Sequence, residues 1–283
     1  METLNQSVRP VGVFPVALRI GCEELLLRDY LMSQQQQANF FKEAGEAPNI
    51  AGGYKDDRME DYVGHIRVLV GDDSVTANIR GVMVPRRDVW TKYGFDTAAE
   101  DIERLPGYAK QRDKKMMNLV FDTPGGYVEG IPEAGLALFN MREWGNLTAY
   151  VHNANSAGAW LASQADEIIV KPSGTVGSIG VRSMHVSFKD RLEKDGIEVT
   201  EFAMPEKKIE LSPYQKLTEE AATHVNAQIG LLFDEFIEAV ARGRGQDKEY
   251  VKKNSGEGRV VTAQDALKDK MIDAIVPASE WGV

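Results

Sequence analysis

The chain has 283 residues, 43% hydrophobic and 27% charged, which suffices for one large domain or two modest ones around a sizeable core. A formal net charge of −10 argues against nucleic acid or an anionic membrane surface as the main partner. The single cysteine, Cys22, excludes an intrachain disulfide and a cysteine-rich zinc site. We find neither a basic leader followed by an apolar run nor a membrane-length apolar stretch, so we expect a cytoplasmic protein.

Residues 1–60 read as an N-terminal extension ahead of the main domain at 61–283. Apolar positions within 23–42 predict a helix there. We interpret the extension as a packing arm or oligomer contact, and an adaptor for another protein is the alternative. Residues 68–84 predict a strand pair around a turn at Gly71-Asp72-Asp73, and a charged connector with a helix at 96–105 follows.

From residue 117 on, the chain alternates between strand and helix patterns. The expected strands are 117–121, 147–152, 167–170, 198–202 and 271–276, and the expected helices are 127–144, 156–165, 186–194, 218–242 and 262–268. Thr218 and Thr262 are suitable N-caps for the last two helices. Repeated strand–helix units predict an α/β fold with a mostly parallel sheet.

Two segments rich in small residues each follow an apolar run. The first is Phe-Asp-Thr-Pro-Gly-Gly at 121–126, and the second is Asn-Ala-Asn-Ser-Ala-Gly-Ala at 153–159. At the start of a helix, backbone N–H groups have no partner inside the helix and can hold a negative charge. We therefore expect the N–H groups of Gly126 and Ala157 to form an oxyanion hole. The alternative for the first segment is an ordinary tight turn from strand to helix.

Ser156 is the candidate nucleophile, because small neighbours allow a substrate carbonyl to approach its hydroxyl. The alternative is a serine that only caps an ordinary helix. A serine nucleophile needs a base, and Lys207 and Lys208 are candidates because adjacent ammonium groups disfavour each other's charge. A solvated loop is the alternative for that pair. The four histidines form no recognisable triad pattern, although His152 stays open as a base because it is close to Ser156 in sequence.

Three motifs in order carry a family resemblance: Pro-Gly-Gly at 124–126, Ser-Ala-Gly-Ala-Trp-Leu-Ala at 156–162, and Gly-Ser-Ile-Gly-Val at 177–181. Together they resemble the signal peptide peptidase A family of serine proteases, over roughly residues 74–276. The resemblance implies a ClpP/crotonase-like spiral of ββα units at 61–283, a Ser–Lys dyad, and no metal or other cofactor. It also implies a homo-oligomer, in which the lysine can reach a neighbouring subunit's serine.

In single-domain members the lysine precedes a proline by five residues, ahead of a long helix. Lys208 stands five residues before Pro213, so it is the predicted base and Lys207 its rival. Pro205-Glu206-Lys207 departs from the family's usual loop, which leaves the choice between the two lysines open.

The N-terminal extension and the missing anchor resemble the phage capsid-maturation branch of the family. That branch implies protein substrates such as scaffold and capsid proteins, in the host cytoplasm or inside the procapsid. One alternative is a cytoplasmic bacterial relative of the signal-peptide peptidases. Another is a non-proteolytic crotonase-fold scaffold or acyl-binding protein, which needs neither Ser156 nor Lys208.

Overall fold

A computed structural model describes residues 16–17, 59–255 and 257–283. Its described residues form two compact units. Unit 1 is Arg182–Leu231, and unit 2 combines the described parts of Val16–Val181 with those of Leu232–Val283. The predicted helix at 23–42 lies outside the described residues, and the domain boundary at residue 60 stays a prediction.

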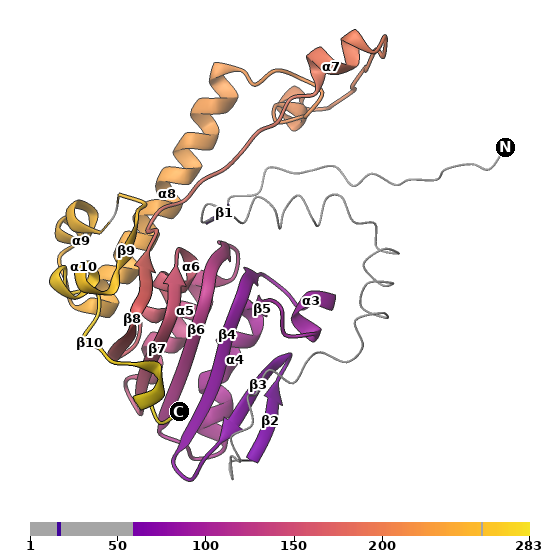
Figure 1. The fold of residues 1–283 in the computed structure, drawn as a ribbon. Coiled ribbons are helices and arrows are strands. Elements are labelled where there is room, and N and C mark those ends of the chain that lie inside the picture. Colours follow the sequence, from indigo (N-terminus) through magenta and orange to yellow (C-terminus); the bar gives the residue numbers. More distant parts are fainter. Residues whose placement is uncertain (1–15, 18–58, 256) are drawn as a thin grey trace. The chain divides into compact units, whose positions relative to one another are not determined.

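A single sheet with mostly parallel strand pairs forms the centre of unit 2 (Figure 1). Its main path has the order β10-β8-β7-β6-β4-β3-β2, while β1, β5 and β9 pair with β6, β4 and β8. The strands are β1 (Val16–Ala17), β2 (Met59–Val63), β3 (Ile66–Val70), β4 (Ser74–Val84), β5 (Thr97–Ala98), β6 (Met116–Tyr127), β7 (Asn146–Asn155), β8 (Glu167–Gly177), β9 (Val260–Thr262) and β10 (Ala274–Ile275). The predicted α/β class with a mostly parallel sheet is confirmed.

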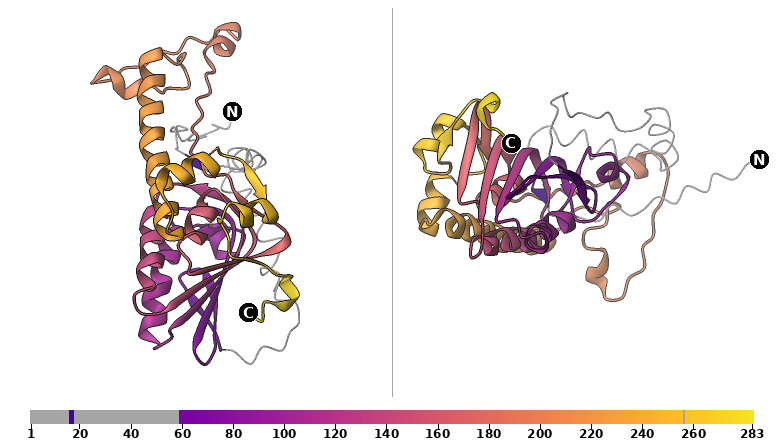
Figure 2. Two further views of the ribbon diagram at one scale, coloured as in Figure 1. Left: turned by 90° about the vertical axis from the view of Figure 1, so that its left-hand side faces the viewer. Right: turned by 90° about the horizontal axis from the view of Figure 1, so that it is seen from below.

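Helices connect the parallel strands and lie along one face of the sheet in unit 2 (Figure 2). The helical elements of the described residues are α3 (Val89–Lys92), α4 (Ala99–Gln111), α5 (Ile131–Met141), α6 (Ala157–Ala162), α7 (Lys189–Lys194), η1 (Glu206–Ile209), α8 (Glu219–Arg244), α9 (Lys248–Asn254), α10 (Ala263–Lys268) and η2 (Ala278–Glu280). No helix within 59–255 or 257–283 combines the length and apolar character that crossing a bilayer requires.

The core of unit 2 explains why these elements form. β4 and β6 pair in parallel, and their inward side chains, such as Ile79 and Phe121, are fully buried. The stacked rings of Trp160 and Phe236, with centroids 4.5 Å apart, join α6 to α8. Gly243 meets the Ser163 backbone where an added Cβ would come within 2.1 Å, so α8 approaches the end of α6 closely.

The hairpin prediction is confirmed: β3 and β4 pair antiparallel, and the Gly71 N–H donates to the Ser74 carbonyl at 2.9 Å. Both predicted caps are also confirmed. The Thr218 hydroxyl accepts the Ala221 N–H, and the Thr262 hydroxyl accepts the Asp265 N–H.

Three element predictions were wrong in position or kind. The strand predicted at 117–121 does not end at Phe121, because Gly125 and Gly126 remain in it and pair with Val82 and Met83 of β4. The helix predicted from Tyr127 therefore begins only at Ile131, after Gly130 with a φ of 85°. Residues 198–202 form no strand; they belong to unit 1, where hydrogen bonds to the Glu201 carboxylate come from Ser212 and Gln215.

Candidate active site

The ends of β6 and β7 bring the two predicted segments together within unit 2. These strands pair in parallel up to Thr123 and Ala154, so the residues that follow leave the sheet at the same edge. A Cβ placed on Gly125 would lie 2.6 Å from the Ser156 Cβ and 2.8 Å from the Asn155 carbonyl oxygen. Gly125 has a φ of 104°, so a side chain there is excluded by conformation as well as by space.

Ser156 occupies a strained position between β7 and α6. Its backbone has φ 56° and ψ −120°, a combination that residues with side chains rarely adopt. The residue is fully buried, and its hydroxyl has no hydrogen-bond partner within the described residues. A buried hydroxyl left unpaired costs about 1–3 kcal/mol. The helix-cap interpretation is wrong, because the Ser156 side chain makes no cap hydrogen bond.

Two backbone hydrogen bonds connect Ser156 to the segment before β9. The Ser156 N–H donates to the Gly177 carbonyl at 2.7 Å, and the Ser178 N–H donates to the Arg259 carbonyl at 2.6 Å. The Gly-Ser-Ile-Gly-Val motif at 177–181 therefore joins the candidate nucleophile to the strand region of β9. Sequence reasoning treated this motif as a family signature and missed its structural connection to Ser156.

Thr123 fixes the other segment. Its hydroxyl donates to the Gly81 carbonyl at 2.6 Å and accepts the Gly125 N–H at 3.0 Å. Gly126 is needed for a different reason than Gly125, since a Cβ there would come within 2.0 Å of the Met83 carbonyl oxygen. The segment is thus a strand end that lies against Ser156 at Gly125, and the predicted turn into a helix from Tyr127 is wrong.

A chain of polar side chains leads to the residue before Ser156. Asn153 donates to the Asp122 carboxylate at 2.9 Å, and the Thr175 hydroxyl donates to the Asn153 amide oxygen at 2.9 Å. Asn155 donates to the Thr175 hydroxyl at 3.1 Å. A carboxylate can only accept, so it fixes the direction of every bond along the chain. The buried Asn155 amide oxygen is left without a partner in the described residues, as an acceptor next to Ser156.

Lys208 and Lys207 both lie in η1 of unit 1, and both side chains are exposed. Lys207 forms an ion pair with Glu220, and hydrogen bonding to that carboxylate raises the pKa of Lys207. We expected each lysine to lower the pKa of the other, but at Lys207 the carboxylate of Glu220 acts in the opposite direction. A raised pKa keeps an amine protonated, so Lys207 is less suited to act as a base.

His152 lies in β7, and its ring packs 4.7 Å from that of Trp281. Burial and then nearby Lys171 lower the pKa of His152, so its neutral form is favoured. The Ser156 hydroxyl has no hydrogen-bond partner in the described part of the chain, so no His–Ser pair forms there.

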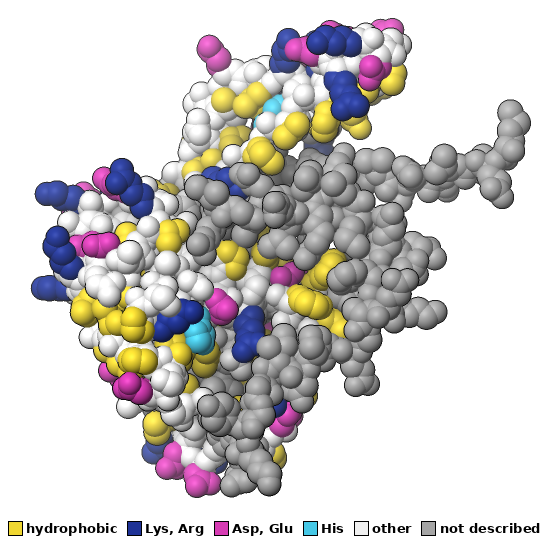
Figure 3. Space-filling view, viewed as in Figure 1, with side chains coloured by type: hydrophobic (Ala, Val, Ile, Leu, Met, Phe, Trp, Pro, Cys, Tyr) yellow, Lys and Arg dark blue, Asp and Glu magenta, His cyan; other side chains and the backbone are white. Residues whose placement is uncertain are grey.

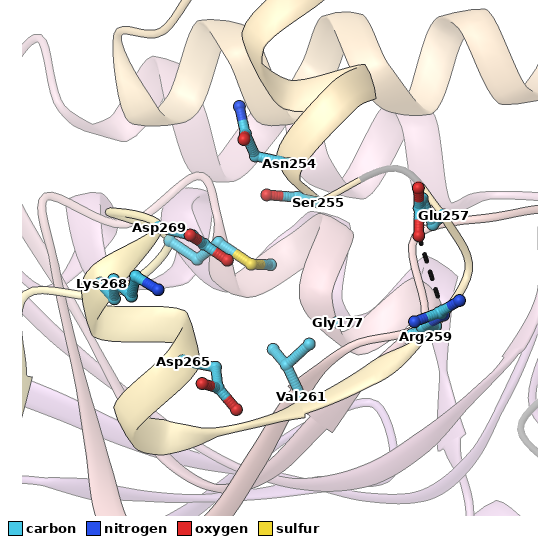
Figure 4. Close-up of a pocket in the computed structure, with 10 residues that line it drawn as sticks. Gly177, Asn254, Ser255, Glu257, Arg259, Val261, Asp265, Lys268 and Asp269 are labelled. Atoms are coloured by element: carbon cyan, nitrogen blue, oxygen red, sulfur yellow. Dashed lines mark ion pairs between the residues drawn. The ribbon is translucent and has the colours of Figure 1, made fainter.

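A hollow of about 240 Å³ lies at the far end of the Gly177 connection (Figure 4). Acidic and basic side chains from α10 and from the segment before β9 line it together, including an ion pair between Glu257 and Arg259 at 3.7 Å. The Ser255 hydroxyl at the end of α9 is buried there without a partner among the described residues. Mixed charge indicates no single ligand class for this hollow.

Comparison with known proteins finds a family that resembles part of the chain. The model of peptidase family S49 matches residues 145–280. The predicted resemblance is confirmed. Over this segment the chain is similar to the S49 peptidases. The match covers Ser156, Ala157 and both candidate lysines, while the Pro-Gly-Gly segment precedes it.

Individual similar proteins come from cells and from phages. A putative protease of Methanocaldococcus jannaschii is 27% identical, with 62% of this chain and 56% of the relative covered. The capsid assembly protease C of Escherichia phage lambda is 28% identical, with 71% and 46% covered. A putative signal peptide peptidase SppA of Enterococcus faecium is 28% identical, with 58% and 49% covered. The chain spans about half the length of these curated relatives.

Proposed function

We propose that the chain is a serine endopeptidase with a Ser–Lys dyad, built on a ClpP/crotonase-like spiral at 61–283. Ser156 is the nucleophile, Lys208 the general base, and the N–H groups of Gly126 and Ala157 hold the oxyanion. The observation that carries the proposal is the strained, buried and unpartnered hydroxyl of Ser156, with Gly125 against it. A serine that served only the fold would be satisfied by a cap or a neighbour.

In the proposed reaction the Ser156 hydroxyl attacks the peptide carbonyl carbon while neutral Lys208 accepts its proton. The negative charge that develops on the carbonyl oxygen is held by the two N–H groups. The intermediate collapses, the C–N bond breaks, and Lys208 returns the proton to the leaving amine. Water then attacks the acyl-enzyme by the same proton path, releases the acid product and regenerates the Ser156 hydroxyl.

The proposed partners are protein substrates, including phage scaffold or capsid proteins, and further copies of this chain. The phage proposal is supported by the lambda relative and by a head-tail preconnector protein of phage P21, 24% identical with 82% of this chain and 44% of the relative covered. The setting is then the host cytoplasm or the procapsid interior. A bacterial role is the alternative, in line with the Enterococcus faecium relative.

The homo-oligomer proposal is supported by the surface of unit 1. Hydrophobic side chains gather there (Figure 3), and Phe202 and Met204 are 92% and 93% exposed. Apolar side chains exposed in a group mark an interaction surface more often than a bare solvent face. Light scattering coupled to gel filtration should show a species larger than one chain.

The decisive experiment is labelling with a fluorophosphonate, followed by mass spectrometry of the labelled peptide. We expect label on Ser156, cleavage of fluorescein-labelled casein, and loss of both in Ser156→Ala. The matched control is Ser163→Ala on the same helical segment, since the Ser163 hydroxyl already donates to the Trp160 carbonyl at 2.7 Å. A folded protein that shows neither labelling nor cleavage would contradict the peptidase and favour the non-proteolytic alternative.

A further inference from the structure

The strand β6 loses one neighbour just where it passes Ser156. On its first side it pairs with β4 as far as Gly126, which lies opposite Met83. On its second side it pairs with β7 only as far as Thr123, opposite Ala154. After Asn155 the β7 chain turns into Ser156 and α6, so that side of β6 is open to another strand beyond Thr123.

The strand β1 takes this open side. Val16 lies opposite Tyr127 and Ala17 opposite Gly126, in antiparallel register. Because Met83 already holds the first side of Gly126, Ala17 must lie on the second side, which β7 has left. Figure 1 marks β1 and β6.

The direction of β1 leads toward the candidate nucleophile. From Val16 to Ala17 the chain passes from Tyr127 to Gly126, and the next residue of β6 in that direction is Gly125. Gly125 is the residue that touches Ser156. The complete burial of Ser156 fits a nucleophile beside an occupied strand position.

We propose that Val16–Ala17 occupies the strand position that a substrate peptide takes beside Ser156, and that this segment of the chain holds the peptidase in an inhibited state. The inference rests on the proposed function. A strand added to an open sheet edge binds mainly through its backbone, so the occupant need not resemble the substrate in side chains. Two paired residues are a short contact, and a longer substrate strand with more backbone pairs displaces them.

The first test is a reversible cross-link. The variant Val16→Cys/Tyr127→Cys in a Cys22→Ser background carries cysteines at positions directly opposite in the register, where antiparallel Cα atoms are close enough for a disulfide. We expect oxidation to link the cysteines within one chain and to lower casein cleavage about tenfold or more, with recovery on reduction, because a linked strand competes intramolecularly.

The matched control is Val16→Cys/Met59→Cys in the same background. Met59 is 51% exposed on β2, which is separated from β6 by β4 and β3. We expect no intrachain link in this control. Failure of the Val16→Cys/Tyr127→Cys pair to cross-link would overturn the inference, and so would a link between two chains or an oxidised protein that cleaves casein at the unlinked rate.

A second variant removes the strand without a cross-link. Val16→Pro/Ala17→Pro takes away two backbone N–H groups and cannot form the same pairing. We expect kcat/KM for casein to rise about fivefold or more, chiefly through a lower KM, while Val16→Ile/Ala17→Val stays at the parent value. An unchanged KM in the proline variant would overturn the inference.

Separate measurements test the proposed peptidase activity and the proposed position of Val16–Ala17. Fluorophosphonate labelling of Ser156 in the reduced protein reports the peptidase, whereas disulfide formation reports the strand position without any activity. A protein that forms the link but shows no labelling when reduced overturns the peptidase and the inhibition together, and leaves only the pairing.

Discussion

The two units of the chain bury their apolar side chains to very different degrees. In unit 2 large side chains such as Phe121, Trp160 and Phe236 are at most 2% exposed. In unit 1 Phe202 and Met204 are almost fully exposed, and the one fully buried hydrophobic residue among its described residues is Ala221. Unit 2 can therefore stabilise itself, whereas unit 1 presents a surface suited to a further partner.

This difference separates the two halves of the proposed dyad. Ser156 belongs to the unit with the closed core, and its backbone N–H donates to the Gly177 carbonyl. Lys208 belongs to the unit with the exposed apolar surface. The proposed nucleophile therefore lies in a closely packed fold, whereas the proposed base lies on an exposed 3-10 turn.

We expect the largest loss of activity when the lysine proposed as the base, in unit 1, is replaced. We expect Lys208→Met to lower kcat/KM for casein about 10²–10⁴-fold, the usual contribution of a general base. Lys207→Met should cost far less, because the ion pair with Glu220 raises the pKa of Lys207 and keeps it charged. A loss of equal size in Lys207→Met would move the role to that residue.

The second prediction concerns a substitution in the core of unit 2. Phe236→Ala removes the ring stacked on Trp160 and should lower the free energy of unfolding by about 3–5 kcal/mol. Urea denaturation followed by tryptophan fluorescence measures it. The counterpart in unit 1 is Phe202→Ser, which should change that free energy by no more than about 0.5 kcal/mol. Its effect should appear instead in light scattering, as a smaller assembly.

A smaller effect concerns the polar chain beside Ser156. Thr175→Val removes the hydroxyl that links Asn153 to Asn155, leaving both amides with unpaired groups. We expect a loss of about 1–3 kcal/mol in the free energy of unfolding. Thr175→Ser keeps the hydroxyl and should recover most of it. Equal losses in the two variants would show that packing of the methyl group matters as much as the hydrogen bonds.

Several features of the fold could be predicted from the sequence, because each depends on residues that are close together in the chain. The turn at Gly71-Asp72-Asp73 and the caps at Thr218 and Thr262 each depend on residues close in sequence. The extension of β6 through Gly125 and Gly126 could not be read this way. Those glycines stay in the strand because β4 lies beside them, and the β4 residues that pair with them come 43 residues earlier.

In the candidate site, too, only the features that depend on nearby residues could be predicted from the sequence. Ser156 was found from its small neighbours and the family motifs, whereas Gly125 stood out only once the structure showed what its missing side chain makes room for. The chain from Asp122 through Asn153 and Thr175 also joins separate strands, so no spacing rule could predict it. Lys208 stays a prediction.

The smallest effect distinguishes the units by their helix caps. Thr218 caps α8 in unit 1, and Thr262 caps α10 in unit 2. Replacing either by alanine should cost about 1 kcal/mol. If unit 2 unfolds as one body, Thr262→Ala lowers its global free energy of unfolding by that amount. If the start of α8 opens on its own, Thr218→Ala leaves the global free energy of unfolding unchanged and speeds amide exchange in the first turn of α8 about fivefold.

Serine at each position keeps the hydroxyl and should restore the parent values. A global loss from Thr218→Ala equal to that from Thr262→Ala would show that both units unfold together, so the difference in their burial would not be a difference in autonomy.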